Sequence, residues 1–364
     1  MTKRRHLRRD QRDFTGGGIF GLPGTHGSTG DKAIDDRIES LVKDWSCGNN
    51  DELIQELIVT SLKIGRDCLP AGDLKLFNRS LKEMQRSSQV FDPYVKERKI
   101  SIFGSARTKP EEPEYQAAVA FAEKMREAGF MGITGAGPGI MEAAQEGAGR
   151  ENSFGLNIKL PFEQGANPTI EGDEKLINFN YFFTRKLAFV KESDAIAALP
   201  GGFGTMDELF EVMTLIQTGK AQVVPIVLLD AEGGTYWKTW FQFVQDHLFR
   251  LGLISEDDFK LFKMTTSVDE AVEEVTTFYR NYHSYRYVGK RLVMRLQNPV
   301  TPALLERLNA DFSDLLEAGK FETCEALPEE ADETHLKDLP RLVCTKKRGI
   351  AGRFRELINA VNEI

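Results

Sequence analysis

The stretch D-A-I-A-A-L-P-G-G-F-G-T-M-D-E, residues 194–208, contains the pattern around which the chain is organised. It begins with an apolar run, residues 195–199, that has the length and composition of a β-strand buried on both faces. The run ends at the loop 200–202, and a helix is expected to follow, with Thr205 as its cap and Glu208 in its first turn. A strand, a glycine loop and a helix N-terminus together present free backbone N–H groups to an anion such as phosphate. The same loop delivers a carboxylate to the side of that phosphate cradle.

The composition excludes several classes of protein. The chain has 364 residues, 41% of them hydrophobic and 28% charged, which is ordinary for a soluble globular protein. Its net charge of -8 argues against general nucleic-acid binding, and no apolar run approaches the length of a membrane span. The 4 cysteines form no C-x-x-C pair, which disfavours a zinc site and fits a reducing cytoplasm. We therefore expect a cytoplasmic protein with no metal, nucleic-acid or membrane partner.

Four regions follow one another along the chain. Residues 1–32 are basic and then glycine-rich, which predicts a flexible tail. Residues 33–95 carry apolar positions at helical spacing and no chemical constellation, so we expect a helical extension that acts as a cap or an oligomer surface. Residues 96–283 alternate strands with helices, which predicts a Rossmann-like, doubly wound parallel sheet. Residues 284–364 are expected to form a small α+β region, whose default role is structural packing, with allosteric binding as the less favoured alternative.

Within the last two regions the apolar patterns predict individual elements. The expected strands of the parallel sheet are 99–103, 130–134, 154–158, 176–179, 195–199 and 223–229, with late helices at 235–248 and 268–279. The C-terminal expectations are one alternating strand over 285–296, a helix over 302–318, strands at 324–327 and 342–344, and a helix over 350–364.

Three turns of small residues follow expected strands of the parallel sheet. They are Gly104-Ser105, the run from Gly135 to Gly139, and the run from Gly201 to Thr205. In doubly wound sheets ligands bind outside the carboxyl ends of the strands, at the topological switch. The coincidence of three such turns predicts a ligand site at this edge of the sheet.

Known sequence motifs for nucleotide binding and for hydrolysis distinguish between several classes of enzyme. The loop G-A-G-P-G at 135–139 does not match G-x-G-x-x-G. No acidic residue ends the following strand to hold a ribose, and the amide Asn157 is the nearest candidate, so an NAD(P)-linked oxidoreductase is disfavoured. Neither a G-x-x-x-x-G-K-S/T loop nor a G-x-S-x-G elbow is present. A carboxylate beside a phosphate loop suits chemistry on a sugar phosphate, because N-glycosidic bonds break through an oxocarbenium-like state. The structural alternatives are a helix-dipole role for Glu208 and a solvated helix face for Arg185-Lys186.

These motifs together resemble those of one family. The run P-G-G-F-G-T-M-D-E from Pro200 to Glu208 resembles the P-G-G-x-G-T-x-x-E signature of the "Lonely Guy" (LOG) family, and Arg185-Lys186 is similar to its R-K motif. The loops after the first two strands resemble its other segments, so the resemblance covers about residues 98 to 280. Members of this family, formerly labelled possible lysine decarboxylases, are nucleoside 5′-monophosphate phosphoribohydrolases, which release a free base and ribose 5-phosphate.

The resemblance implies a catalytic pair, Arg185 and Glu208, and a phosphate cradle. The substrate-binding residues that we expect are Gly104, Ser105, Gly135, Gly137, Glu142, Lys186, Gly201, Gly202, Gly204, Thr205 and Asp207. The implied substrates are AMP, cytokinin riboside or pyrimidine monophosphates, with no metal or organic cofactor and a homodimer or higher homo-oligomer as the assembly. The second glycine loop departs from the G-G-G of short LOG proteins, and Glu142 adds a carboxylate there, for which ribose hydroxyls are a candidate contact. The flanking regions resemble those of longer bacterial members, and a nucleotide-binding sensor without catalysis is the alternative function.

Overall fold

The computed structural model of the protein describes residues 27–46, 48, 50–159, 165–331, 333–347 and 349–363. The flexible tail expected at residues 1–32 therefore lies mostly outside the described residues. The chain divides into two compact units, one that ends at Gln85 and one that runs from Arg86 to Ile364.

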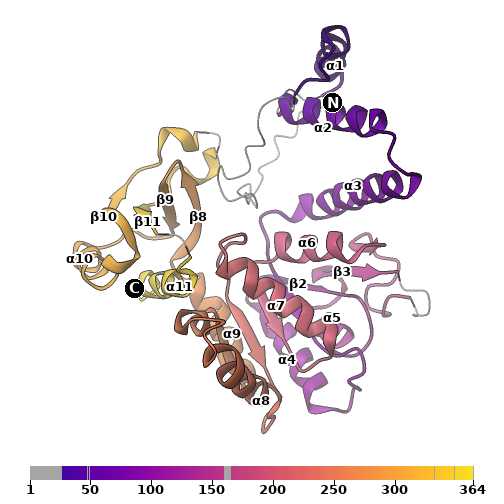
Figure 1. Ribbon diagram of the computed structural model, residues 1–364. Coiled ribbons are helices and arrows are strands. Elements are labelled where there is room, and N and C mark those ends of the chain that lie inside the picture. The colour runs from indigo at the N-terminus through magenta and orange to yellow at the C-terminus, as the bar shows by residue number, and fades with distance from the viewer. Residues whose placement is uncertain are drawn as a thin grey trace. The chain divides into compact units, whose positions relative to one another are not determined.

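The first unit is helical. Its elements are α1 (Lys32–Trp45), α2 (Asp51–Arg66) and the beginning of α3 (Ala71–Phe91), shown in indigo and purple in Figure 1. Asp31 caps α1, because its side chain accepts hydrogen bonds from two backbone N–H groups of the first turn. Ile38, Val42 and Val59 form a small buried cluster between α1 and α2. This region is thus helical, as the apolar spacing predicted.

The second unit is built on a parallel sheet of seven strands in the order β4-β3-β2-β1-β5-β6-β7, of which Figure 1 labels β2 and β3. The strands are β1 (Arg98–Phe103), β2 (Phe130–Thr134), β3 (Ser153–Ile158), β4 (Leu176–Phe179), β5 (Ala195–Ala198), β6 (Ile226–Leu229) and β7 (Phe262–Thr265). The chain adds strands outward from β1 to β4, and then outward from β5 to β7 on the other side. The topological switch therefore lies between β1 and β5, which pair directly from Ile100 with Ala195 to Phe103 with Ala198.

Helices cover both faces of this sheet, which confirms the doubly wound fold. They are α4 (Pro113–Glu127), α5 (Ile140–Ala148), α6 (Phe182–Glu192), α7 (Phe203–Gln217), α8 (Tyr236–Phe243) and α9 (Val268–Phe278). The side chains of β5 alternate between two apolar layers, with Ile196 in the layer of α6, α7 and α8, and Ala197 in the layer of α4, α5 and α9. This double burial explains why the strand has no polar position.

The expected start of β6 and the expected extent of the helix over 235–248 were wrong, and β7 was not predicted. Strand β6 begins at Ile226 rather than at 223, after Pro225, which has no N–H to donate to a ladder. Strand β7 was missed, because this edge strand is only partly buried and its sequence F-K-M-T is no continuous apolar run. The helix expected over 235–248 divides into α8 and a π-helical segment, Val244–Phe249.

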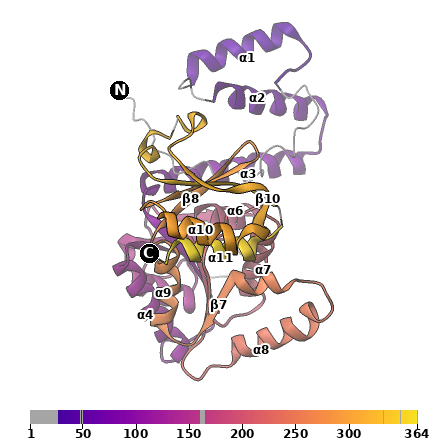
Figure 2. The same cartoon turned by 90° about the vertical axis from the view of Figure 1, so that its left-hand side faces the viewer.

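The C-terminal α+β region has a second sheet, antiparallel, in the order β10-β11-β9-β8 (Figure 1), and Figure 2 labels its edge strands β8 and β10. Its elements are β8 (Tyr282–Val288), β9 (Arg291–Leu296), α10 (Pro302–Asp311), β10 (Leu316–Cys324), β11 (Arg341–Lys346) and α11 (Ala351–Val361). The single strand expected over 285–296 is a hairpin that turns at Gly289, where φ is 60°. The helix expected over 302–318 ends at Asp311, and the strand expected at 324–327 lies earlier, because pairing with β11 draws 316–324 into the sheet.

A buried ionic cluster fixes this second sheet. Arg295 and Arg341 come from adjacent strands, and Glu330 lies between them, all three with fully buried side chains. Arg295 Nη2 is 2.6 Å from Glu330 Oε1, and Arg341 Nε is 3.4 Å from Glu330 Oε2. Apolar side chains of β9 belong to the same core layer as α6 and α7, so the region packs as part of the second unit. In the part of the chain that the structure describes, no helix is both long and apolar enough to traverse a bilayer.

Candidate active site

The three small-residue loops meet at the switch between β1 and β5. The Ser105 N–H donates to the Pro200 carbonyl oxygen at 3.1 Å, and the Ile140 N–H donates to the Ser105 carbonyl oxygen at 2.9 Å. Gly139 has a φ of +67°, and a Cβ there would lie 2.4 Å from the Ser105 oxygen. A Cβ on Gly104 would lie 2.5 Å from the Ile140 side chain. Glycine is therefore required at both positions for the loops after β1 and β2 to touch.

The second loop lies beside the arginine of α6. A Cβ on Gly135 would lie 2.8 Å from Met141 Sδ and 3.8 Å from Arg185 Nη1, and a Cβ on Gly137 would lie 2.7 Å from Met141 Cε. The two glycines thus let Met141, in the first turn of α5, fold back under its own loop. The consequence is that this loop forms one wall of the space around Arg185.

The N-terminus of α7 follows directly on the glycine loop after β5. The helix begins at Phe203, and the cap residue is Gly202, which has no side chain that could accept a hydrogen bond from the first turn. The expectation that Thr205 caps the helix and that Glu208 lies in its first turn was therefore wrong. The two glycines of the loop let the chain turn helical earlier, so Thr205 lies inside the first turn and Glu208 in the second. Nothing lies within 4 Å of where a Cβ would stand on Gly202 or Gly204. The first N–H groups of a helix have no partner within the helix, and such groups can bind an anion.

The first glycine of this loop is held from both sides. A Cβ on Gly201 would lie 2.1 Å from Thr205 Oγ1, so a side chain cannot be accommodated there. The Tyr236 hydroxyl, from the start of α8, donates a hydrogen bond to the Gly201 carbonyl oxygen. In a trans peptide the carbonyl and the next N–H point in opposite directions, so this bond fixes the direction of the Gly202 N–H. Tyr236 had not been identified from the sequence, because no motif or spacing connects it with the loop.

Arg185 and Glu208 come together next to this helix terminus. Arg185 Nη2 lies 3.5 Å from Glu208 Oε1, and Glu208 is only 6% exposed. The guanidinium group of Arg185 also lies over the Phe182 ring, 5.2 Å from its centroid. Burial raises the pKa of Glu208 to about 7, against the opposing effects of Arg185 and Lys186. The site therefore holds a carboxyl group that changes its charge near neutral pH, the property expected of a catalytic acid or base.

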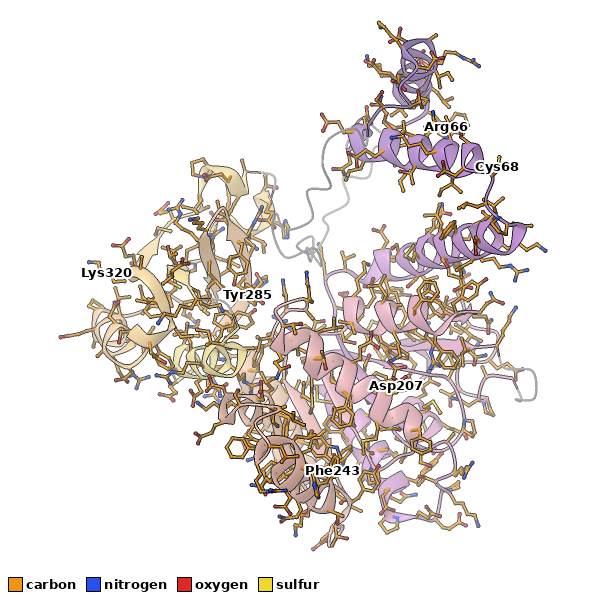
Figure 3. The ribbon with its side chains drawn as sticks, viewed as in Figure 1. Arg66, Cys68, Asp207, Phe243, Tyr285 and Lys320 are labelled. Atoms are coloured by element: carbon orange, nitrogen blue, oxygen red, sulfur yellow. The ribbon has the colours of Figure 1, made fainter. Side chains whose placement is uncertain are left out.

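Lys186 and Asp207 lie close enough to influence the charge of Glu208, whereas Glu142 lies on α5. Lys186 Nζ is 2.9 Å from Asp207 Oδ2 and also contacts Glu211, which ties α6 to α7. Asp207, labelled in Figure 3, lies on the exposed side of α7. Glu142 lies one helical turn before Glu146, whose carboxylate accepts a hydrogen bond from Tyr115 of α4. The structure thus gives Lys186 and Asp207 a shared ion pair, and it places Glu142 on the side of α5 that faces α4.

The fold and the site define an α/β protein with a glycine loop at a helix N-terminus and a buried arginine–glutamate pair. The family model described as "Possible lysine decarboxylase" matches residues 141–275. Cytokinin riboside 5′-monophosphate phosphoribohydrolase LOG1 of Arabidopsis thaliana is 36% identical over 94 residues, which cover 26% of this chain and 42% of the relative. The LOG enzyme of Oryza sativa subsp. japonica is 29% identical over 193 residues, which cover 51% of this chain and 75% of the relative. These matches confirm the resemblance to the LOG family, although the match spans less than half the length of the Arabidopsis relative.

Solved structures show weaker likeness. The molybdenum cofactor binding protein from Rippkaea orientalis is 18% identical with a TM-score of 0.36, and the match covers 49% of this chain and 94% of that chain. DNA processing protein A from Helicobacter pylori is 15% identical with a TM-score of 0.35, and the match covers 51% of this chain and 82% of that chain. Neither likeness bears on function.

Proposed function

We propose that the protein hydrolyses the N-glycosidic bond of nucleoside 5′-monophosphates and releases the free base and ribose 5-phosphate. The observation that carries this proposal is the buried Arg185–Glu208 pair beside the N-terminal turns of α7. The names of the LOG relatives support the same class of reaction. The substrates we propose are AMP-like, cytokinin riboside or pyrimidine monophosphates.

The cradle binds the 5′-phosphate in this proposal. Gly202 is the residue that precedes α7, and Gly204 and Thr205 belong to its first turn, so their N–H groups lie at the helix terminus where the dipole favours an anion. Ser105 lies next to them, because its N–H bonds to the Pro200 carbonyl of the same loop. The phosphate anchors the substrate, so that the sugar extends along α7 towards Glu208, one helical turn further on.

Glu208 and Arg185 act on the bond between the sugar and the base. The ionised carboxylate stabilises positive charge at C1′ and accepts a proton from the water molecule whose oxygen bonds to C1′. The bond from C1′ to the base nitrogen breaks, and the electron pair leaves with the base. Arg185 stabilises that negative charge with its positive charge. Its guanidinium group keeps its proton throughout, because guanidinium is too weak an acid to act as a general acid. The proton that Glu208 accepted is then available to the departing base.

The assembly and the compartment belong to the same proposal. We propose a cytoplasmic homodimer or higher homo-oligomer, and the reaction as written requires no metal or organic cofactor. Apolar side chains on the exposed side of α6 support an interface there, since Phe182 and Phe183 are 50% and 54% exposed.

Product analysis with a panel of substrates tests the proposal. The purified protein is incubated with AMP, CMP, UMP and isopentenyladenosine monophosphate, and the free base and ribose 5-phosphate are separated by chromatography. Adenosine is the matched control, because it has the same glycosidic bond but no phosphate for the cradle, and it should react far more slowly. Binding of the monophosphates without release of a base would support the sensor function instead and refute the enzyme.

A further inference from the structure

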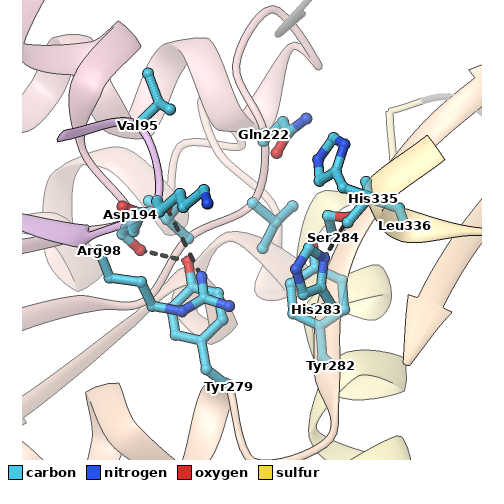
Figure 4. Close-up of a pocket in the computed structure, with 13 residues that line it drawn as sticks. Val95, Arg98, Asp194, Gln222, Tyr279, Tyr282, His283, Ser284, His335 and Leu336 are labelled. Atoms are coloured by element: carbon cyan, nitrogen blue, oxygen red, sulfur yellow. Dashed lines mark hydrogen bonds and ion pairs between the residues drawn. The ribbon is translucent and has the colours of Figure 1, made fainter. Parts of the chain in front are cut away.

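A cavity, whose lining residues Figure 4 shows, lies outside the amino ends of the parallel strands. Its volume is about 330 Å³. Arg98 is the first residue of β1, and Asp194 directly precedes β5, so this wall lies outside the amino ends of the two central strands. The glycine loops follow the carboxyl ends of the same strands. The opposite wall carries His283 of β8 and His335, so the cavity is bounded by the parallel sheet and the C-terminal region.

The cationic group on the first wall is held rigidly. The guanidinium group of Arg98 lies over the Tyr279 ring, 3.5 Å from its centroid, and 3.7 Å from Asp194 Oδ1. The Tyr279 hydroxyl donates to the Asp194 carbonyl oxygen at 2.6 Å, and Asp194 Oδ2 accepts the Lys99 N–H at 2.8 Å. Because the Arg98 side chain is already held in place, it loses little conformational entropy when a ligand binds.

The charges around the cavity favour an anion. Asp194 is the one carboxylate among the described residues that line it, and this carboxylate already contacts Arg98. Lys96 adds a second formal positive charge, and His283 and His335 contribute ring nitrogens from the other wall. The cavity thus has a positive balance in a chain whose net charge is -8.

The shape and the arrangement of donors indicate the kind of anion. The remaining walls include apolar side chains such as Val223, Val224 and Leu336, and the volume lies at the lower end of the range for small-molecule sites. The nitrogen groups lie on different walls, and the guanidinium group of Arg98 already has a carboxylate partner. A tetrahedral phosphate accepts hydrogen bonds from several directions, whereas a carboxylate is best matched by one free planar fork.

We propose that this cavity is a binding site for a small organic molecule that carries a phosphate group. The proposal is independent of the proposed function, because no residue of the cavity belongs to the glycine-loop site. The two sites are connected by β1 and β5, each of which runs from one site to the other.

Calorimetric titration of the full chain tests this proposal. The probes are ribose 5-phosphate, glycerol 3-phosphate and AMP, with succinate as the carboxylate control. All titrations use a Gly202→Asp background, in which a carboxylate blocks the cradle of α7; the open space at this glycine accommodates the side chain. At least one phosphate probe should bind this protein, and succinate should bind at least about tenfold more weakly.

The cavity is then altered at two exposed positions, which protects the fold. Adding Lys96→Ala and His335→Ala should lower the affinity for the phosphate probe at least about tenfold, because two charge-assisted contacts are removed. Lys263→Ala with His247→Ala is the matched control, since it removes the same residue types at exposed positions that do not line the cavity. The proposal is overturned if no phosphate probe binds at millimolar concentration, if succinate binds equally well, or if the Lys96/His335 variant binds like the control. As a second readout, the phosphate probe should protect His283 and His335 from diethylpyrocarbonate; unchanged modification would also contradict the proposal.

Discussion

Replacement of Glu208 by glutamine is expected to stabilise the folded protein at pH 8 while it removes the proposed catalytic group. The side chain is 6% exposed, and burial raises the pKa of its carboxyl group from an ordinary 4.5 to about 7. Glutamine has almost the same shape and no charge, so it avoids the ionisation of a buried group. Natural sites often retain such unfavourable groups because function requires them.

The size of this effect follows from the two pKa values. The folded state holds the Glu208 proton more tightly than the unfolded state does, so the contribution of this group to stability is fully present below pH 4.5. It is lost as the pH rises through about 7. At about 1.36 kcal/mol per pKa unit, the loss reaches about 3 kcal/mol at pH 8, and it is under about 1 kcal/mol at pH 5.

Urea unfolding at pH 8 and pH 5 measures this difference. Trp237 and Trp240 are buried in the same unit as Glu208, so tryptophan fluorescence reports its unfolding. Glu208→Gln should be more stable than wild type by about 3 kcal/mol at pH 8, and the gain should nearly vanish at pH 5. Glu232→Gln, at an exposed carboxylate, is the matched control and should show no such pH dependence. Equal or lower stability of Glu208→Gln at pH 8 would refute the reasoning.

Three further predictions concern activity and the glycine loop. The pH profile of kcat/KM for AMP should fall on the acid side with a midpoint near 7, because the ionised form of Glu208 is required; a flat profile from pH 6 to 8 would contradict this. Gly201→Ala should abolish activity and lower the thermal midpoint, since its Cβ would lie 2.1 Å from Thr205 Oγ1, whereas Gly204→Ala has open space and should keep the thermal midpoint or raise it. Tyr236→Phe should raise the KM about two- to tenfold, as expected for the loss of one hydrogen bond that orients the loop, and an unchanged KM would exclude that positioning role.

Much of the parallel sheet could be predicted because its strands are buried on both faces. The run before Pro200 is continuously apolar for this reason, and it forms β5 as expected. Elements with one exposed face could not be predicted equally well. The sequence of β10, L-E-A-G-K-F-E-T-C, contains helix-forming residues, and only its pairing with β11, a strand that follows later in the chain, makes it a strand.

The candidate site could be predicted as far as topology determines it. Loops that follow neighbouring parallel strands must meet at one edge, and Arg185 and Glu208 do lie 3.5 Å apart there. The first residue of α7 could not be predicted from capping preferences. Thr205 is a favourable cap residue, but the glycines before it allow the helix to begin at Phe203. The hydrogen bond from Tyr236 to the glycine loop and the cavity beside Arg98 could not be predicted, because they depend on tertiary contacts between distant segments.

The rate of ribose 5-phosphate formation from AMP by Glu208→Gln tests the central claim most directly. At pH 8 this variant should bind AMP with an affinity close to that of wild type, but its kcat should be at least about 100-fold lower, as for the loss of a catalytic acid or base. Glu232→Gln should react at the wild-type rate. If Glu208→Gln released the base as fast as wild type, or if wild type bound AMP and released none, the proposed reaction at this site would be contradicted.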